Sequence, residues 1–207
     1  ALVTGPYPGM GTGDPDLYKA FCWRFWNLVS KDGGWIGVVL PRSALNAKGS
    51  GDFRKFVFEN SNPFNVTMVV NQREWVFPEV HQQYCIGLVT LRRAAPDGKS
   101  VRLCGPFASL ERFRVGEKLP PAEFNASEVL SWTDCASLPL LPTEKSLEIF
   151  TQLRKSPRLD LNNTNSWRAR PHTELHATND KGLMDLKSAD KPRGFWSVFK
   201  GESFELW

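Results

Sequence analysis

The spacing of apolar residues predicts alternating helices and strands in the first 93 residues. Apolar positions three or four apart predict an amphipathic helix whose inward face carries Leu17, Phe21, Phe25, Leu28 and Val29. Asp14 or Asp16 is available as its N-cap, and Gly33-Gly34 is a suitable end. The run 35–40 then has no polar alternation, which is typical of a strand covered on both faces in a parallel sheet.

The same pattern predicts a second helix and two more strands. The helix begins near Ser50 or Asp52 and turns Phe53, Phe56 and Val57 inward. The strands are predicted at residues 66–71 and 86–92. Strands that alternate with helices indicate an α/β layer.

The pattern changes after Arg93. Residues 100–142 are rich in proline and break into short apolar pieces, so this stretch is predicted to be irregular. A helix is predicted at 143–155, with Thr143 as its cap and Leu147, Phe150 and Leu153 inward. A last strand is predicted at 194–199.

Composition narrows the class of protein. With 41% hydrophobic and 12% aromatic residues in 207 positions, the chain has enough apolar surface for a packed core. Its net charge of +4 is compatible with a polyanionic partner without identifying one. The four cysteines form no CxxC pair, which indicates free thiols in a cytoplasmic protein. No signal peptide and no apolar run of about 18 residues is present, so no membrane partner is predicted.

Two motifs that suggest bound ligands have simpler interpretations. The glycines at 9–13 do not follow a strand, so a flexible loop is favoured over a phosphate-binding loop. His172 and His176 are four apart, but Glu174 is not directly after the first histidine, as a zinc peptidase requires. No metal site is therefore predicted.

Two aromatic features allow a functional interpretation. Phe77 lies in the aromatic turn 75–78 between two predicted strands, where it is either a core plug or a ligand contact, because α/β sheets bind ligands where their strands end. Arginine alternates with aromatic residues later in the chain, an arrangement suited to phosphate contacts and base stacking, at Trp167, Arg168, Arg170 and Arg193.

The order of these motifs resembles that of the N6-adenine DNA methyltransferases, most closely the methylase modules of type IIG restriction–modification enzymes. The matching segments cover nearly the whole chain. They are Asp16-Leu17-Tyr18 with Phe21, the stretch from Gly33-Gly34 to Leu45, Phe53 to Phe56, Val76-Phe77-Pro78, Leu138 to Glu144, Trp167 to Asp180, and Val198 to Glu202.

The resemblance implies an α/β fold, the second half of a Rossmann-like sheet that binds S-adenosylmethionine (SAM). By it, residues 1–93 form the C-terminal half of the catalytic domain, 94–156 a linker, and 157–207 the start of a DNA target recognition region. It implies a SAM contact at Phe21 and Leu17 and a stacking role for Phe77 on a flipped adenine. It also implies contacts to double-stranded DNA from Trp167, Arg168, Arg170 and Arg193.

The chain also departs from that family. The Phe-x-Gly-x-Gly loop, the acidic residue that holds the ribose and the Asn-Pro-Pro-Tyr loop are absent from the 207 residues. The chain is therefore expected to be a piece of a SAM-dependent adenine methyltransferase that is inactive alone. The alternative is a non-catalytic nucleic-acid-binding module that uses the arginine and aromatic residues of 154–207. The sequence predicts no oligomeric state.

Overall fold

The structure is a computed structural model that divides into two compact units, residues 1–157 and 158–207. It describes Met10, Gly13 and residues 15–161, 167–169, 175–176, 178–185, 190–191 and 193–198, without the side chain of Glu144. No helix in these residues is long and apolar enough to cross a bilayer.

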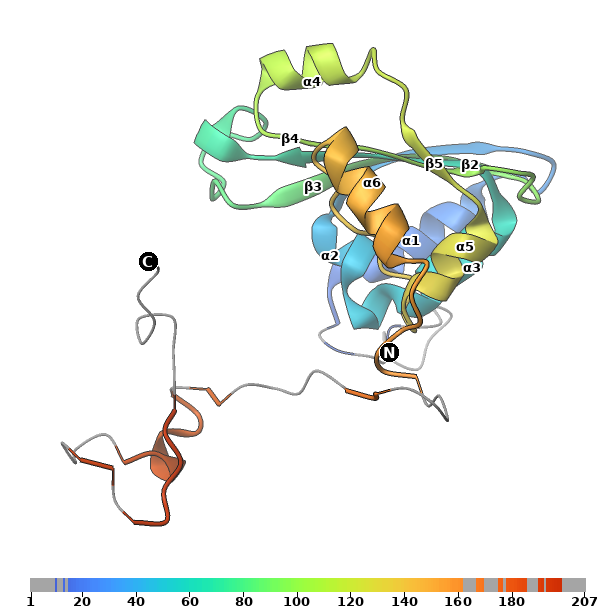
Figure 1. The fold of residues 1–207 in the computed structure, drawn as a ribbon. Coiled ribbons are helices and arrows are strands. Elements are labelled where there is room, and N and C mark those ends of the chain that lie inside the picture. The colour runs from blue at the N-terminus through green and yellow to red at the C-terminus, as the bar shows by residue number, and fades with distance from the viewer. Residues whose placement is uncertain are drawn as a thin grey trace. The chain divides into compact units, whose positions relative to one another are not determined.

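The first unit is built on a five-stranded sheet in the order β1-β3-β2-β4-β5. The strands are β1 (Trp35–Pro41), β2 (Ser61–Val70), β3 (Cys85–Arg93), β4 (Val101–Phe107) and β5 (Ala122–Phe124). β3 is antiparallel to both β1 and β2, whereas β2 and β4 are parallel. It follows that β1, β2 and β4 run in the same direction and that their carboxyl ends share one edge of the sheet (Figure 1).

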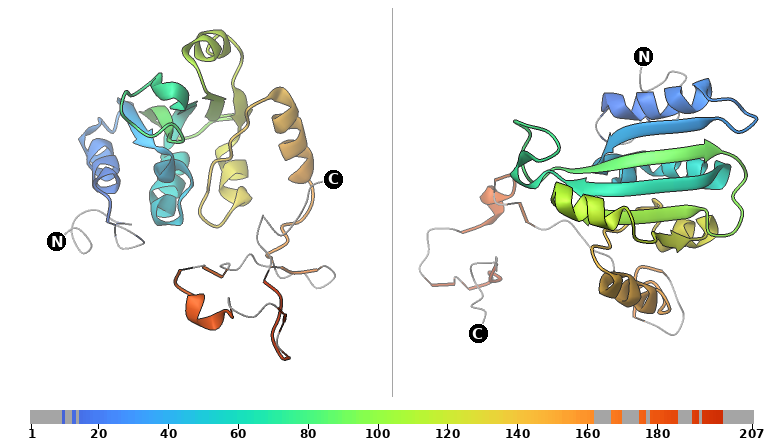
Figure 2. Two further views of the ribbon diagram at one scale, coloured as in Figure 1. Left: turned by 90° about the vertical axis from the view of Figure 1, so that its left-hand side faces the viewer. Right: turned by 90° about the horizontal axis from the view of Figure 1, so that it is seen from above.

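Helices α1, α3 and α5 line one face of the sheet, and α4 lies on the opposite face (Figure 2). The core fills the space between the sheet and these three helices, with Val57, Phe58, Val66, Val89 and Val101 almost fully buried. The helices are α1 (Leu17–Leu28), α2 (Arg42–Asn46), α3 (Gly51–Asn60), α4 (Leu110–Gly116), α5 (Ala126–Trp132) and α6 (Glu144–Leu153), with 3-10 turns η1 (Lys48–Ser50), η2 (Gln72–Glu74) and η3 (Lys181–Leu183).

The structure confirms a mixed α/β fold and corrects the expectation of a parallel sheet covered on both faces. β1 is the edge strand of the described sheet, and its partner β3 is antiparallel. Its residues alternate in exposure: Leu40 is buried, while Trp35 and Val39 are 58% and 54% exposed. Ile36, Val38 and Leu40 face the core, and the residues between them lie on the opposite face of the sheet, where Trp35 and Val39 are left uncovered.

Helix α1 forms as predicted, but its buried face is not the predicted one. Trp23 and Trp26 are buried, with ring centroids 5.1 Å from Phe53 and 5.2 Å from Phe56. Leu17, Phe21 and Leu28 are instead exposed. α1 has two apolar faces, and the indole rings bury more area than Leu or Phe, so they take the inward position. The helix also ends at Leu28, before Gly33-Gly34.

The outward face of α1 is expected to contribute little to the stability of the chain. We predict that Leu28→Ser changes the free energy of unfolding by no more than about 0.5 kcal/mol, because the 69% exposed side chain has little contact area to lose. Urea denaturation of the 207-residue chain measures the change. A loss above about 1.5 kcal/mol, the value for a well-buried leucine, would show that this face is covered in solution.

The predicted irregular stretch is the largest difference between expectation and structure. Residues 101–124 contain β4, α4 and β5, and these strands extend the same sheet as β1 to β3. α5 then packs its buried Val129 and Trp132 into the common core. Proline and glycine residues lie inside or between these elements. Each element is too short for its apolar residues to form a recognisable helix or strand pattern.

Predictions for the other elements are largely confirmed. The strands at 66–71 and 86–92 are β2 and β3, and the second helix is α3. Thr143 caps α6 by accepting a hydrogen bond from the Ser146 N–H at 3.0 Å. Leu153, predicted inward, is 66% exposed. Residues 195–198 have no regular secondary structure, so the strand predicted at 194–199 is wrong for the part of it that is described.

A buried arginine joins three segments beneath the sheet. Arg54 of α3 is 1% exposed and donates hydrogen bonds to four main-chain carbonyls. The acceptors are Ala44 at 2.9 Å, Ala47 at 2.8 Å, Cys135 at 2.7 Å and Ala136 at 3.1 Å. Burial lowers the pKa of Arg54 to about 10. The guanidinium therefore ties α2 and the turn after α5 to α3.

Candidate functional site at the carboxyl edge of the sheet

The candidate site is the loop between β2 and β3, which begins at the carboxyl end of β2. The loop contains η2 and the predicted aromatic turn, and Phe77 within it is 40% exposed. The carboxyl ends of β1 and β4 lie at the same edge. Phe77 is thus at the rim of the sheet, where α/β proteins bind ligands, and is not buried as a core plug.

Asn71 organises this loop from its base. The side chain is 0% exposed, and its Oδ1 accepts hydrogen bonds from the N–H groups of Val76 at 3.1 Å and Phe77 at 2.9 Å. Its Nδ2 donates to the carbonyls of Phe77 and Val80, both at 2.9 Å. Both main-chain polar groups of Phe77 are therefore bonded to one side chain. Our sequence analysis did not single out Asn71; a polar residue between an apolar strand and an aromatic turn is the signal that could have indicated it.

Trp75 is a second anchor of the loop. Its Nε1–H donates to the carbonyl of Val70, the last residue of β2, at 2.7 Å. Its ring centroid lies 6.2 Å from that of Phe113 in α4, which in turn is 5.9 Å from Phe107 at the end of β4. The loop is thereby fixed to two neighbouring parallel strands.

The loop contains three residues with left-handed backbone. Arg73, Glu74 and Glu79 have φ values of 57°, 59° and 63°. Such conformations cost of order 1–3 kcal/mol each in a residue other than glycine, and they cluster at ligand-binding and catalytic sites. The strain is consistent with a loop shaped for a ligand.

The two residues with a predicted cofactor role lie on the first half of α1. Leu17 and Phe21 are 63% and 52% exposed, and the Phe21 ring stacks on that of Phe25 at 5.9 Å. The first turn of α1 lies beside the carboxyl end of β1, because Tyr18 Oη is 3.1 Å from Oγ of Ser50 in η1.

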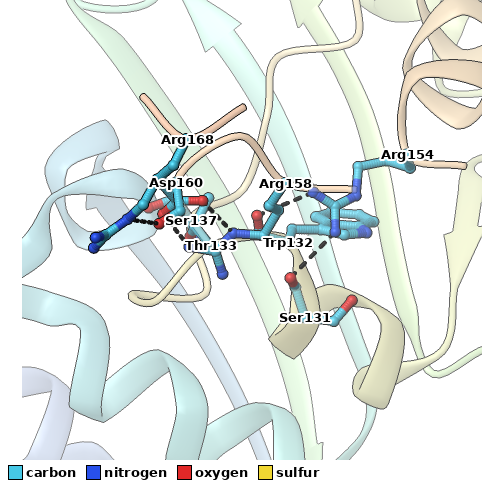
Figure 3. A network of polar contacts seen from close by, with 8 residues as sticks. All are labelled: Ser131, Trp132, Thr133, Ser137, Arg154, Arg158, Asp160 and Arg168. Carbon is cyan, nitrogen blue, oxygen red and sulfur yellow. Dashed lines mark hydrogen bonds and ion pairs between the residues drawn. The ribbon is translucent and has the colours of Figure 1, made fainter. Parts of the chain in front are cut away.

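The residues with a predicted DNA role lie in the second unit. Trp167 is 86% exposed, and Arg168 and Arg193 are also exposed. Arg168 Nε donates to the carbonyl of Asp160 at 3.3 Å (Figure 3). Arg170 lies outside the described residues. The structure thus exposes three of these four residues.

Two other arginines, Arg93 and Arg154, have structural roles. Arg93 lies 4.8 Å from the ring centroid of Trp26 and donates to the Val29 carbonyl, just after α1, at 3.3 Å. Arg154 donates to the carbonyls of Ser131 and Trp132 in the last turn of α5, both at 3.1 Å (Figure 3). Cations at a helix C-terminus stabilise its unpaired carbonyls, so these two arginines stabilise the fold.

The described residues present few groups for nucleophilic or metal chemistry. Burial raises the pKa of the Cys22 thiol to about 12 and also raises the pKa of Cys85 and Cys104. Since the thiolate is the reactive form, these three are poor nucleophiles at neutral pH. The described part of the chain contains no group of three His, Cys, Asp or Glu residues that could hold a metal ion. His172 and Glu174 lie outside it.

No protein-family model matches the chain, and no curated protein is similar to it in sequence at a significant level.

Proposed function

We propose that this chain is the second half of the catalytic sheet of a DNA N6-adenine methyltransferase together with part of its DNA-binding region. Phe77 receives the extruded target adenine, and Phe21 with Leu17 contacts the cofactor. The observation that carries the proposal is the exposed Phe77 ring on an ordered, strained loop at the carboxyl edge of the sheet.

The chemistry of the reaction requires such a ring. The exocyclic amine of adenine is out of reach within the duplex, so the base must be swung out, at a cost of a few kcal/mol. Stacking on an aromatic side chain recovers about 1–3 kcal/mol per base. A half-exposed phenylalanine held through its main chain suits this role better than a freely moving one, because it loses less entropy on binding.

The free edge of β1 and the outward face of α1 support a sheet that continues in the complete enzyme. β1 is the edge of the described sheet and exposes Trp35 and Val39, while α1 exposes Phe21 on its outward face. Unpaired strand edges and contiguous apolar surface favour further pairing. The proposed complete enzyme adds to these 207 residues a segment with the Phe-x-Gly-x-Gly and Asn-Pro-Pro-Tyr loops.

The residues of this chain fit a cofactor only in part. The exposed ring of Phe21 offers a flat apolar surface on which an adenine group can lie. SAM, when bound, supplies the methyl group that the adenine amine receives. The chain holds the base at Phe77 and covers one side of the cofactor at Phe21, and the loops of the added segment complete the site.

DNA contacts are proposed for the second unit. Trp167 and Trp196 are 86% and 92% exposed and lie near Arg168 and Arg193 in the sequence. Exposed indoles next to guanidinium groups are suited to base stacking and phosphate contacts. The same observation favours the second candidate function, a binding module without catalysis.

Methyl transfer by the complete enzyme tests the proposal. The gene is sequenced beyond the region that encodes residues 1–207, where we expect an Asn-Pro-Pro-Tyr or Asn-Pro-Pro-Phe motif. The complete product is then incubated with tritiated SAM and with long DNA amplified without methylation. We expect tritium in N6-methyladenine. A complete product without the motif that transfers no label would contradict the proposal and favour the binding module.

The 207-residue chain by itself is expected to bind SAM weakly. It lacks the loops that hold the methionine part and the ribose, so most of the polar contacts to the cofactor are missing. Isothermal titration calorimetry should give a Kd above about 1 mM, equivalent to less than about 4 kcal/mol of binding free energy. Micromolar binding would mean that the cofactor site is complete within these residues.

A further inference from the structure

Asn71 uses its entire hydrogen-bonding capacity on the Phe77 loop. Its Oδ1 accepts two hydrogen bonds and its Nδ2 donates two, the full capacity of a primary amide. Its main-chain N–H donates to the Tyr84 carbonyl and its carbonyl accepts from the Glu74 N–H, both at 2.9 Å. Asn71 thus joins the start, the middle and the end of the loop.

Neither aspartate nor alanine satisfies these partners. Aspartate has the same shape, but it would direct a charged oxygen at the carbonyls of Phe77 and Val80, which require a donor. Alanine would leave those carbonyls and the N–H groups of Val76 and Phe77 without a partner at a buried position. The site therefore selects a neutral amide of this length.

The orientation of the Phe77 ring depends on the main chain more than on side-chain packing. The ring is 40% exposed, so neighbouring side chains do not enclose it. Its N–H and its carbonyl are both bonded to Asn71, at 2.9 Å each. The left-handed backbone at Arg73, Glu74 and Glu79 is retained only if other contacts hold it. Asn71 supplies four such contacts from a fully buried position.

We propose that Asn71 is a positioning residue for base stacking: it holds the main chain of Phe77 so that the ring faces the extruded adenine. This inference rests on the proposed function, in which Phe77 is the stacking residue. Asn71 itself touches neither base nor cofactor and acts through Phe77 alone.

Hydrogen exchange in the 207-residue chain tests the first part of the inference. In Asn71→Ala the amides of Val76 and Phe77 should exchange at least about tenfold faster than in the wild type, because alanine removes the side-chain oxygen that accepts a hydrogen bond from both N–H groups. The matched control is Val129 in α5, whose amide is bonded to the Asn125 carbonyl and should keep its rate. Unchanged exchange at Phe77 would overturn the inference.

A double-mutant cycle in the complete enzyme tests the second part. Asn71→Ala should lower kcat by about 5- to 100-fold, with the KM for DNA within about threefold, because stacking of one base is worth about 1–3 kcal/mol. In the Phe77→Ala background the same substitution should change kcat less than about twofold, because a residue that acts through Phe77 has nothing left to position. An equal loss in both backgrounds would indicate a general structural role and overturn the inference.

Trp75→Phe is a second variant of the same loop, to be used if the Asn71 variants do not fold. It retains an aromatic ring near Phe113, but that ring is smaller than the indole and lacks the hydrogen bond to Val70. It should lower kcat in the wild-type background and not in the Phe77→Ala background, and a loss in both would overturn the idea that the loop acts through Phe77. A wild-type complete protein that transfers no methyl group overturns the proposed function itself; exchange at Phe77 then still reports whether Asn71 orders the loop.

Discussion

Replacing Phe77 by alanine in the complete enzyme is expected to lower kcat for methyl transfer by about 10- to 100-fold while changing the Kd for duplex DNA less than about threefold. In the proposed function the ring stabilises the extruded adenine by about 1–3 kcal/mol, and this contact is made only after the base has left the duplex. Ground-state binding to the duplex depends mainly on phosphate contacts elsewhere. Single-turnover transfer from tritiated SAM and fluorescence anisotropy of labelled duplex measure the two quantities.

Tyr84 provides the matched control. It is an aromatic residue near the end of the same loop and is 59% exposed, more than Phe77. Tyr84→Ala should leave kcat within about twofold, and Phe77→Trp should retain most of the activity because any flat ring can stack on a base. Equal losses for Phe77→Ala and Tyr84→Ala would reject a specific stacking role. The binding-module alternative expects no methyl transfer from the wild type and at most a modest loss of affinity.

Replacing Arg54 by methionine is expected to destabilise the 207-residue chain by about 3–5 kcal/mol, a large part of the stability of a domain of this size. The guanidinium donates to the carbonyls of Ala44, Ala47, Cys135 and Ala136, and these would remain buried without partners. Each unsatisfied buried carbonyl costs about 1–3 kcal/mol, partly relieved by water. Urea denaturation followed by far-UV circular dichroism measures the loss.

Arg24→Met is the control for the removal of an arginine. Arg24 lies on α1 and is exposed, so its replacement should change the stability by no more than about 0.5 kcal/mol. Arg54→Lys should be destabilised nearly as much as Arg54→Met. The single ammonium group of lysine cannot donate to carbonyls as widely spaced as those that the planar guanidinium reaches. A stable Arg54→Met variant would mean that the three segments are held together by apolar packing alone.

Short-range patterns predicted several elements correctly. β2 and β3 coincide with runs of apolar and β-branched residues, and α6 begins at Thr143 because a threonine hydroxyl satisfies the first free N–H groups of a helix. These features depend on residues within a few positions of one another. The sequence contains all the information that they require.

The faces that the elements bury were less predictable. Leu17 and Phe21 were expected inward on α1, yet Trp23 and Trp26 occupy the core. Both faces of α1 are apolar, so helical periodicity does not distinguish them. The face that is buried is the one that fits against Phe53 and Phe56 of α3. Whether both faces of β1 are covered likewise depends on which helices pack against the sheet.

The candidate site likewise contains one residue that the sequence indicated and one that it did not. Phe77 was singled out as a core plug or a ligand contact from its place in an aromatic turn after a strand, and its 40% exposure excludes the core plug. Asn71 was not identified, because an asparagine at the end of a strand is common in turns. Its importance depends on Phe77, six residues away, and on Val80, nine residues away, both of which it contacts.

The amino-acid sequence by itself determined that this chain forms a mixed α/β layer with an aromatic turn between two strands, because helix and strand periods and turn residues act over short distances. The tertiary structure alone decided the order of the strands, the inward face of α1 and the roles of Arg54 and Asn71. A buried polar group is tolerated only where the fold brings its partners within hydrogen-bonding distance, and most of those partners lie too far away in the sequence for a local pattern to show them.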